Sequence, residues 1–581
     1  MRFTLWQSGI RARVWRAAFA LALTLTAGAS TADNGTPGGD GKPQYGGTLE
    51  IGTVYVTLSA LSWDPQDWNW KLNHDTGFFY EQLFAADLDK SVRKGGKHHF
   101  YADAWLPSDA IRGELAESWE WKKNPLAVVI HLRKGVMFPA KAGVIEKPRE
   151  LTAEDVVFSY NRLDKSPKKI PNYFDHIAKV EARDKYTVVF TFKEYNAEWD
   201  YRFGWGYYSA IVPKEMAKVD AKDWHNAVGS GPFQLAEFVQ GNSQTYVKNP
   251  EYWDKEKLGG ASYKIPFVDK VVYRTIKDEA TQHTALRSGK IDILEIMRWT
   301  AADELKKTVP QLKWSKWLSM NGQFIALRTD QKPFNDIRVR RALNMAVNKQ
   351  EIVQAYYGGN AELFAYPMHP DYYGYFEPLE KMPASVKELF TYNPEKAKKL
   401  LAEAGYPNGF TFKVQYTSAN PDHADLLPLI AGYLEKVGVK IEIQPMEYGA
   451  FLSAMTTKTH SAGYLMNNGH TNPTTSIRKS FITGQVWNPS IWADPAFDKK
   501  MDEVYRTRDE AKRQKMIKEM TVEILDKAPY IWLPTPYIFT AWWPWVKNYN
   551  GELRAGAVRP APIYARIWID QDMKRKMGFS N

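Results

Sequence analysis

One polar stretch late in the chain carries side chains that could bind a small molecule. Its neutral hydrogen-bonding residues are Asn467, Asn468, His470 and Asn472, and the cationic residues Arg478 and Lys479 follow closely. No acidic residue lies between Gly463 and Arg478. Amides can both donate and accept hydrogen bonds without carrying charge. The stretch therefore offers neutral polar contacts with positive charge nearby.

Residue patterns typical of catalysis or metal binding are missing. The chain has no Cys, which excludes disulfides, thiolate metal sites and Cys nucleophiles. The H-E-x-x-H, G-x-S-x-G and P-loop patterns are absent. His98 and His99 lack a third ligand at metal-binding spacing, so we assign them to a solvated loop. We predict no catalytic residue, no metal site and no cofactor.

An exported hydrolase stays open as an alternative. Such an enzyme would cleave a saccharide with two carboxylates held about 5 to 9.5 Å apart. A single sequence does not give that separation.

The first residues are typical of an export signal. Arg2, Arg11, Arg13 and Arg16 precede an apolar run over residues 17–29, and small residues follow. The run is shorter than the roughly 20 apolar residues that a membrane-spanning helix needs. We predict a cleaved signal peptide over 1–32, a flexible mature N-terminus over 33–44, and a periplasmic protein that, lacking Cys, carries no lipid anchor.

Composition and charge narrow the class of partner. The formal net charge of +11 falls to +7 once the four leader arginines are removed. Basic residues are interspersed with acids, so we predict no nucleic-acid partner. A weak positive field favours an anionic ligand or an acidic partner surface.

The apolar periodicity alternates between strand and helix and predicts an α/β fold. It predicts strands over 48–56, 410–416 and 439–444 and helices over 336–357, 394–404 and 426–437. From residue 394 onward a helix, a strand, a helix and a strand follow one another in the chain. This alternation indicates a parallel sheet in that region.

Several ordered motifs resemble one known family. They are LAESW (115–119), IHLRKGVMF (130–138), LTAEDVVFSY (151–160), GSGPF (229–233), NPEYW (249–253), RSGKID (287–292), PFNDIRVRRAL (333–343) and YNPEKA (392–397). With these motifs the chain resembles family 5 of the bacterial solute-binding proteins, the peptide, nickel and oligopeptide-binding class that serves ABC importers. Because turns and packing account for the motifs, we interpret them as markers of the fold.

The resemblance implies a two-lobed α/β periplasmic-binding-protein (Venus flytrap) fold with an extra subdomain in lobe one. The expected divisions are lobe I over 45–77, an inserted subdomain over 78–200, lobe I again over 201–319, lobe II over 320–534 and a C-terminal return to lobe I over 535–581. The implied partners are a small-molecule ligand and the permease subunits of an ABC importer in the inner membrane, and the implied state is a monomer.

The resemblance also implies where the ligand lies: at the start of lobe I, near the hinge, and on a loop of lobe II. The corresponding residues are Trp63, Trp205, Met320, Asn321, Met466, Asn467, Asn468, His470, Asn472 and Arg478. Peptide-binding members carry an amine-binding Asp four residues before the Pro of this loop, whereas this chain has Gly469. Burying an ammonium without a carboxylate partner is costly, so an ordinary peptide is disfavoured.

Once ordinary peptides are disfavoured, two classes of ligand fit the candidate residues. Amides and Trp rings suit an oligosaccharide, with Trp68, Trp70 and Trp299 as further stacking candidates. Guanidinium groups suit a polycarboxylate or an anionic metal chelate, with Arg298 and Arg328 as further candidates. A periplasmic peptide-binding chaperone, with broad and weak affinity for unfolded chains, is a third alternative.

Overall fold

The computed structural model describes residues 42–53, 61–67, 71–101, 105–166, 169, 173–469 and 472–579. The predicted signal peptide and the candidate residues Trp68, Trp70 and His470 lie outside these ranges. Within the described ranges no helix is long and apolar enough to cross a bilayer.

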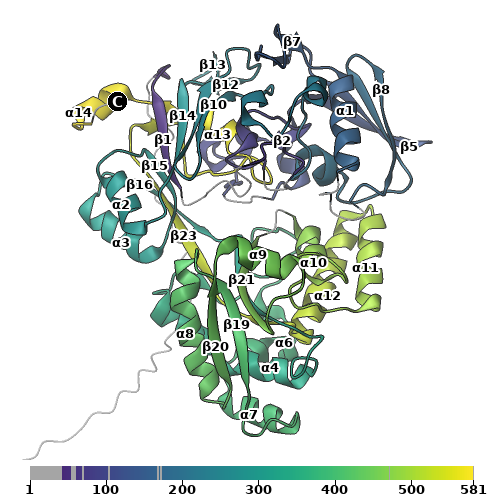
Figure 1. The fold of residues 1–581 in the computed structure, drawn as a ribbon, viewed down its shortest axis with the longest axis vertical. Coiled ribbons are helices and arrows are strands. Elements are labelled where there is room, and N and C mark those ends of the chain that lie inside the picture. The colour runs from purple at the N-terminus through teal and green to yellow at the C-terminus, as the bar shows by residue number, and fades with distance from the viewer. Residues whose placement is uncertain are drawn as a thin grey trace, which may run out of the picture. The chain divides into compact units, whose positions relative to one another are not determined.

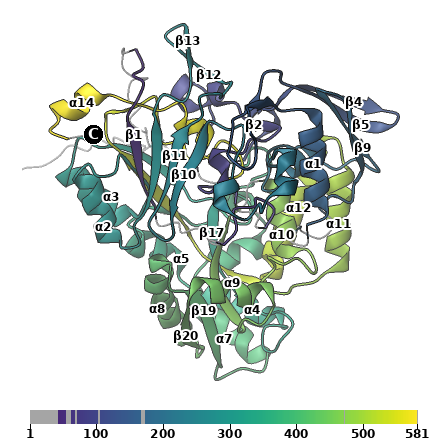
Figure 2. The same ribbon diagram turned by 45° about the horizontal axis from the view of Figure 1, so that its top comes forward.

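One eight-stranded mixed sheet collects strands from the beginning, middle and end of the chain (Figure 1). Its order is β10 (Phe233–Val239), β11 (Ser243–Lys248), β14 (Lys270–Thr275), β1 (Thr48–Thr53), β15 (Ile293–Met297), β23 (Thr535–Trp542) and β16 (Lys313–Leu318), and β18 (Ala361–Glu362) pairs with β23. β1 runs parallel to β14 and β15, whereas β23 is antiparallel to β15, β16 and β18. Helices α2 (Glu279–Arg287) and α3 (Trp299–Thr308) pack beside this sheet (Figures 1 and 2).

A second, four-stranded antiparallel sheet has the order β4 (Ala116–Lys123), β5 (Leu126–Leu132), β9 (Thr187–Phe192) and β8 (Ile177–Asp184). Helix α1 (Ala153–Asp164) packs against β8 and β9. One continuous apolar core, from Ile51 of β1 to Val128 of β5, joins this sheet to the eight-stranded one. We call both sheets and their shared core lobe I.

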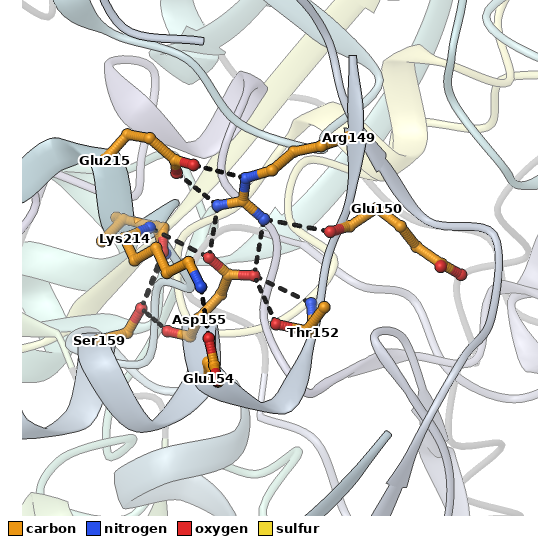
Figure 3. A network of polar contacts seen from close by, with 9 residues as sticks. Arg149, Glu150, Thr152, Glu154, Asp155, Ser159, Lys214 and Glu215 are labelled. Carbon is orange, nitrogen blue, oxygen red and sulfur yellow. Dashed lines mark hydrogen bonds and ion pairs between the residues drawn. The ribbon is translucent and has the colours of Figure 1, made fainter. Parts of the chain in front are cut away.

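A capping box formed by Thr152 and Asp155 starts α1. The Asp155 carboxylate accepts the backbone N–H of Thr152 at 2.9 Å, and Arg149 binds the same carboxylate with two nitrogens at 2.7 and 3.0 Å (Figure 3). Arg149 also binds Glu215, with Nε at 2.7 Å from Oε1. Through Arg149 the helix start is thereby tied to a distant segment of lobe I at Glu215.

A five-stranded sheet forms the centre of the other half, which we call lobe II. Its order is β20 (Lys440–Met446), β19 (Thr411–Thr417), β21 (Gly463–Gly469), β17 (Asn321–Leu327) and β22 (Tyr530–Trp532). The pairing of β19 with β20 is parallel, as predicted. Successive residues of β17 pack into two different apolar cores, one on each face of the sheet. Phe324 belongs to one core and Ile325 to the other, because successive side chains of a strand point to opposite faces.

Helices cover both faces of the lobe II sheet. One face carries α4 (Ile337–Ala346), α7 (Pro394–Glu403) and α8 (Pro421–Glu435), and the other carries α9 (Tyr448–Thr456), α10 (Pro473–Phe481), α11 (Pro495–Arg506) and α12 (Glu510–Lys527) (Figure 1). The helix predicted over 394–404 and the strands predicted over 410–416 and 439–444 are present.

The prediction of one continuous helix over 336–357 is wrong. The chain leaves α4 at Val347, whose backbone is extended, and Asn348 caps a new helical turn by accepting the N–H of Glu351 at 3.1 Å. A short polar side chain that binds its own backbone competes with a continuous helix. The spacing of apolar residues continues across Val347, so it does not reveal this interruption.

The chain passes between the lobes at two adjacent places. β16 ends at Leu318 in lobe I and β17 begins at Asn321 in lobe II, while β22 ends at Trp532 in lobe II and β23 begins at Thr535 in lobe I. Backbone hydrogen bonds join the two passages, since Ser319 N donates to Pro536 O at 3.0 Å.

Candidate ligand-binding site

Four of the candidate residues meet at one end of the lobe II sheet. Strand pairing places Asn321 opposite Gly469 and Gly322 opposite Asn468, so that Met320, Asn321, Asn467 and Asn468 lie beside the passage from β16 to β17. About 146 residues of chain separate the paired positions, yet antiparallel register brings them into contact.

The two amides near the end of β21 have different surroundings. Asn467 is exposed. Asn468 is buried, donates to Ser480 Oγ at 3.2 Å and accepts from Lys479 Nζ at 3.2 Å. The Lys479 ammonium also lies over the ring of Trp487, 4.4 Å from its centroid. A cation therefore stands at the end of β21, where the sequence has no carboxylate.

Two of the candidate residues have structural tasks in lobe II. Met466 is buried in the core beneath α9 to α12. Asn472 caps α10, because its side-chain oxygen accepts the N–H groups of Thr474 and Thr475 at 2.9 and 3.2 Å. Its Oδ1 atom is thus committed to the helix.

Two of the tryptophan candidates of lobe I are packed into its core. Trp63 and Trp205 are each only 1% exposed. Trp63 packs edge-on against Phe238, and the Trp205 indole donates to Asp200 at 3.3 Å. Neither ring offers a free face on which a ligand could stack. Trp299 is half-buried and lies against Gly358, close to the crossing between the lobes.

Each arginine candidate already faces a carboxylate. Arg298 binds Glu279 at 2.6 Å and Asp425 at 3.0 Å, and Arg328 binds Asp330 at 2.7 Å. Arg478 is buried, with Nε 3.7 Å from the Glu198 carboxylate of lobe I. An anionic ligand would have to share or displace these partners.

The sequence did not mark Glu198 as a functional residue. It is 1% exposed and receives hydrogen bonds from Arg202 of its own lobe and from Thr474 and Thr475 of lobe II. Burial disfavours its charge, but Arg202 and Arg478 outweigh that penalty and hold the pKa of Glu198 below its ordinary value. Nothing in the motif NAEWD indicates such a role, because the partners lie far away in the sequence.

A cavity of about 320 Å³ opens between the segment after β9 and helices α10 and α11. Tyr173, Arg202 and Arg478 lie among its buried lining residues, whereas Glu194 and Asp502 are exposed at its edge. Its volume is at the lower end of the range of small-molecule sites. Of the candidate residues it contains only Arg478, so it is separate from the cluster at the end of β21. No group of three or more His, Asp or Glu side chains in the described ranges could hold a metal ion.

The chain is similar to a family of bacterial binding proteins and to several of its members. The model of the bacterial extracellular solute-binding proteins, family 5 (middle part) matches residues 110–488. Heme-binding protein A of Haemophilus influenzae is 29% identical over 76% of this chain and 82% of its own length, and di/tripeptide-binding protein 1 of Pseudomonas aeruginosa is 28% identical over 71% and 79%.

A solved structure agrees in fold. The periplasmic binding protein DppA of Helicobacter pylori, in complex with the peptide STSA, superposes with a TM-score of 0.74 at 25% identity and covers 91% of this chain and 99% of its own. The predicted two-lobed periplasmic-binding-protein fold is confirmed. The chain belongs to family 5 of the bacterial extracellular solute-binding proteins.

Proposed function

We propose that this protein captures a small polar solute that lacks a free α-ammonium group and delivers it, chemically unaltered, to the permease subunits of a membrane importer. As a member of family 5, the chain is the substrate-binding component of an ABC importer. The proposal concerns the class of solute.

The observation that carries the proposal is the chemistry at the end of β21. Gly469 stands opposite Asn321, no acidic residue occurs between Gly463 and Arg478, and the Lys479 ammonium contacts the neighbouring Asn468. A ligand ammonium buried beside Gly469 would find no carboxylate in this stretch. Such a group pays its desolvation without compensation, which disfavours peptides with free amino termini.

An anionic solute is the first candidate, either a polycarboxylate or its metal chelate. The Lys479 ammonium can pair with a carboxylate, and the exposed Asn467 can add a neutral hydrogen bond. The positive net charge of the chain would favour the encounter.

An oligosaccharide is the second candidate, favoured by the three amides Asn321, Asn467 and Asn468 at this end of the sheet. Amides satisfy hydroxyl groups as donors and as acceptors. The burial of Trp63 and Trp205 removes two of the rings expected to stack on a sugar, which places this class second.

A thermal-shift screen tests the proposal, because a ligand that binds only the folded state raises Tm by mass action. The probes are citrate, its iron(III) chelate, cellotetraose, and the peptide Ala-Ala with a free or an acetylated amino terminus. We expect citrate or its chelate to raise Tm and free Ala-Ala to leave it unchanged. A clear shift with free Ala-Ala and none with the other probes would contradict the proposal.

The rival classes give different results in the same samples. Release of shorter sugars from cellotetraose would indicate a hydrolase, whereas saturable binding without product would support transport. Weak binding of many unfolded chains, with no response to any small probe, would indicate a chaperone.

A further inference from the structure

A buried carboxylate of lobe I is held by the first turn of a lobe II helix. Glu198 follows β9, and its Oε1 accepts hydrogen bonds from the hydroxyls of Thr474 and Thr475 in α10, at 2.6 and 2.9 Å. All three side chains are at least nine-tenths buried. We propose that Glu198 is a latch that holds the two lobes closed, whatever solute lies between them.

Lobe I itself fixes the orientation of the latch. Arg202 binds Glu198 Oε2 with Nε at 3.0 Å and Nη2 at 2.9 Å, and its Nη1 donates to the backbone oxygen of Tyr173 at 2.9 Å. The guanidinium is thus tied at both ends within lobe I. One carboxylate oxygen is held by lobe I, and the other remains directed at lobe II.

Lobe II presents several donors to that carboxylate. The Thr475 hydroxyl donates to Glu198, whereas the single hydroxyl proton of Thr474 is shared between Glu198 and the Oδ1 of Asn472. Arg478, one turn further along α10, adds a second positive charge at 3.7 Å. The positive end of the helix dipole also favours an anion here. Opening the lobes would separate these groups from Glu198 but leave Arg202 in place.

Neighbouring contacts extend the junction between the lobes. Ala197 N donates to the backbone oxygen of Tyr505 at 2.9 Å, and the Arg202 guanidinium lies 5.1 Å from the centre of the Tyr505 ring. The same short segment of lobe I therefore contacts both α10 and α11. Because these polar groups are shielded from water, their interactions are stronger than those of exposed pairs.

A second acidic residue provides a matched control. Glu194, four positions before Glu198, binds Arg506 of α11 at 2.9 Å, but the two side chains are 52% and 61% exposed. Exposed ion pairs contribute little because water and salt screen them. Both pairs join the same segment to lobe II, so they differ mainly in burial.

The experiment measures closure directly in the ligand-free protein. Because the chain has no Cys, Lys179→Cys and Lys515→Cys introduce two label positions, one in each lobe, at side chains 65% and 79% exposed. Pulsed electron paramagnetic resonance between nitroxides at these sites gives the distribution of distances between the lobes. We expect Glu198→Gln to lower the ratio of closed to open molecules about tenfold, the effect of losing a charge-assisted hydrogen bond. We expect Glu194→Gln to leave the ratio unchanged.

A substitution in lobe II tests the latch without altering Glu198 itself. Thr475→Val removes the hydroxyl that contacts Glu198 but leaves the Glu198–Arg202 pair in lobe I intact. We expect it to open the lobes as well, and the double variant to open them little more than Glu198→Gln alone. If Glu198→Gln unfolds the protein, Thr475→Val decides alone. Equal distance distributions in the wild type and the folded latch variants would overturn the latch.

The latch rests on the two-lobed fold and not on the identity of the solute. Failure of every probe in the thermal-shift screen would contradict the proposed ligand class while leaving the distance measurement unaffected. Conversely, an absent latch would leave solute capture intact.

Discussion

At the scale of single residues, the absence of a carboxylate at Gly469 is the reason for expecting a ligand without a free ammonium group. It lies in strand β21, so a side chain there meets no backbone restriction. We expect Gly469→Asp to create affinity for free Ala-Ala, measured as a rise in Tm of a few degrees at saturating peptide, because the carboxylate supplies a partner for the ammonium. Gly469→Asn matches the new side chain in size but lacks its charge.

Comparing Gly469→Asp with Gly469→Asn separates the effect of charge from the effect of side-chain size. A shift with Asp and none with Asn supports the electrostatic reason for excluding peptides. Equal shifts with both would mean that shape rather than charge controls the site.

A second residue, Glu81, gives stability a distinct pH dependence. It is fully buried and accepts the Trp253 indole N–H at 2.9 Å, while the nearby Arg559 is bound by Glu114. Burial and the charge of Glu114 raise the pKa of Glu81 to about 8. Between its ordinary pKa and pH 8 the folded protein therefore holds a proton that the unfolded chain has released, and stability falls as pH rises.

Replacing Glu81 by Gln keeps the acceptor for Trp253 and removes the titration. We expect the unfolding free energy of Glu81→Gln, measured with urea between pH 5 and 9, to fall less with rising pH than that of the wild type. Glu120→Gln, at an exposed site of β4, serves as control and should follow the wild-type curve. Parallel curves for the wild type and Glu81→Gln would refute the assignment.

At the scale of elements, the start of α1 depends on Asp155. Its carboxylate satisfies the Thr152 N–H and neutralises Arg149, and it is fully buried (Figure 3). We expect Asp155→Asn to lower the unfolding free energy by about 3 kcal/mol, since it weakens a buried charge pair and leaves Arg149 without one of its two carboxylates. Urea titration measures the loss.

The adjacent Glu154 is the control, because its side chain is 66% exposed. Its partner, Lys214, is half-exposed as well, and such pairs contribute less than about 1 kcal/mol. A comparable loss for Glu154→Gln would show that helix charge in general, and not the buried network, stabilises this region.

At the scale of the whole molecule, lobe I is completed only by the C-terminal segment. β23 lies between β15 and β16 and joins β18 as well. Beyond it, Trp545 is buried and donates to Asp292 at 2.7 Å. β16 therefore cannot join β15 and the strands beyond it in one sheet until the end of the chain has been added.

A chain that ends at residue 534 tests this dependence. We expect its lobe I to be digested rapidly by a protease under conditions where the full chain resists, because β15 and β16 lose their common neighbour and the core beneath them is exposed to water. Supplying residues 535–579 as a separate peptide should restore part of the resistance. Full resistance of the shortened chain without the peptide would show that lobe I folds independently.

The sequence alone determined the class of this protein. Apolar periodicity predicted the strands β19 and β20 and the helix α7, because periodicity depends on residues close together in the chain. The two-lobed fold was implied by the resemblance of the ordered motifs to family 5, and it is confirmed. The ligand and the lobe boundaries stay predictions. The sequence also identified the polar stretch at 467–472, and strand pairing shows that its first two residues lie beside Asn321.

Only the tertiary structure decided the partner of each charge and the burial of each ring. Glu198 meets Thr474 across 276 residues, and Trp63 and Trp205, expected at the ligand, are enclosed in the lobe I core. The helix break at Val347 likewise needed the three-dimensional backbone. Burial and ion pairing depend on which distant segments pack together, and that choice is made by the sum of many contacts rather than by any local pattern.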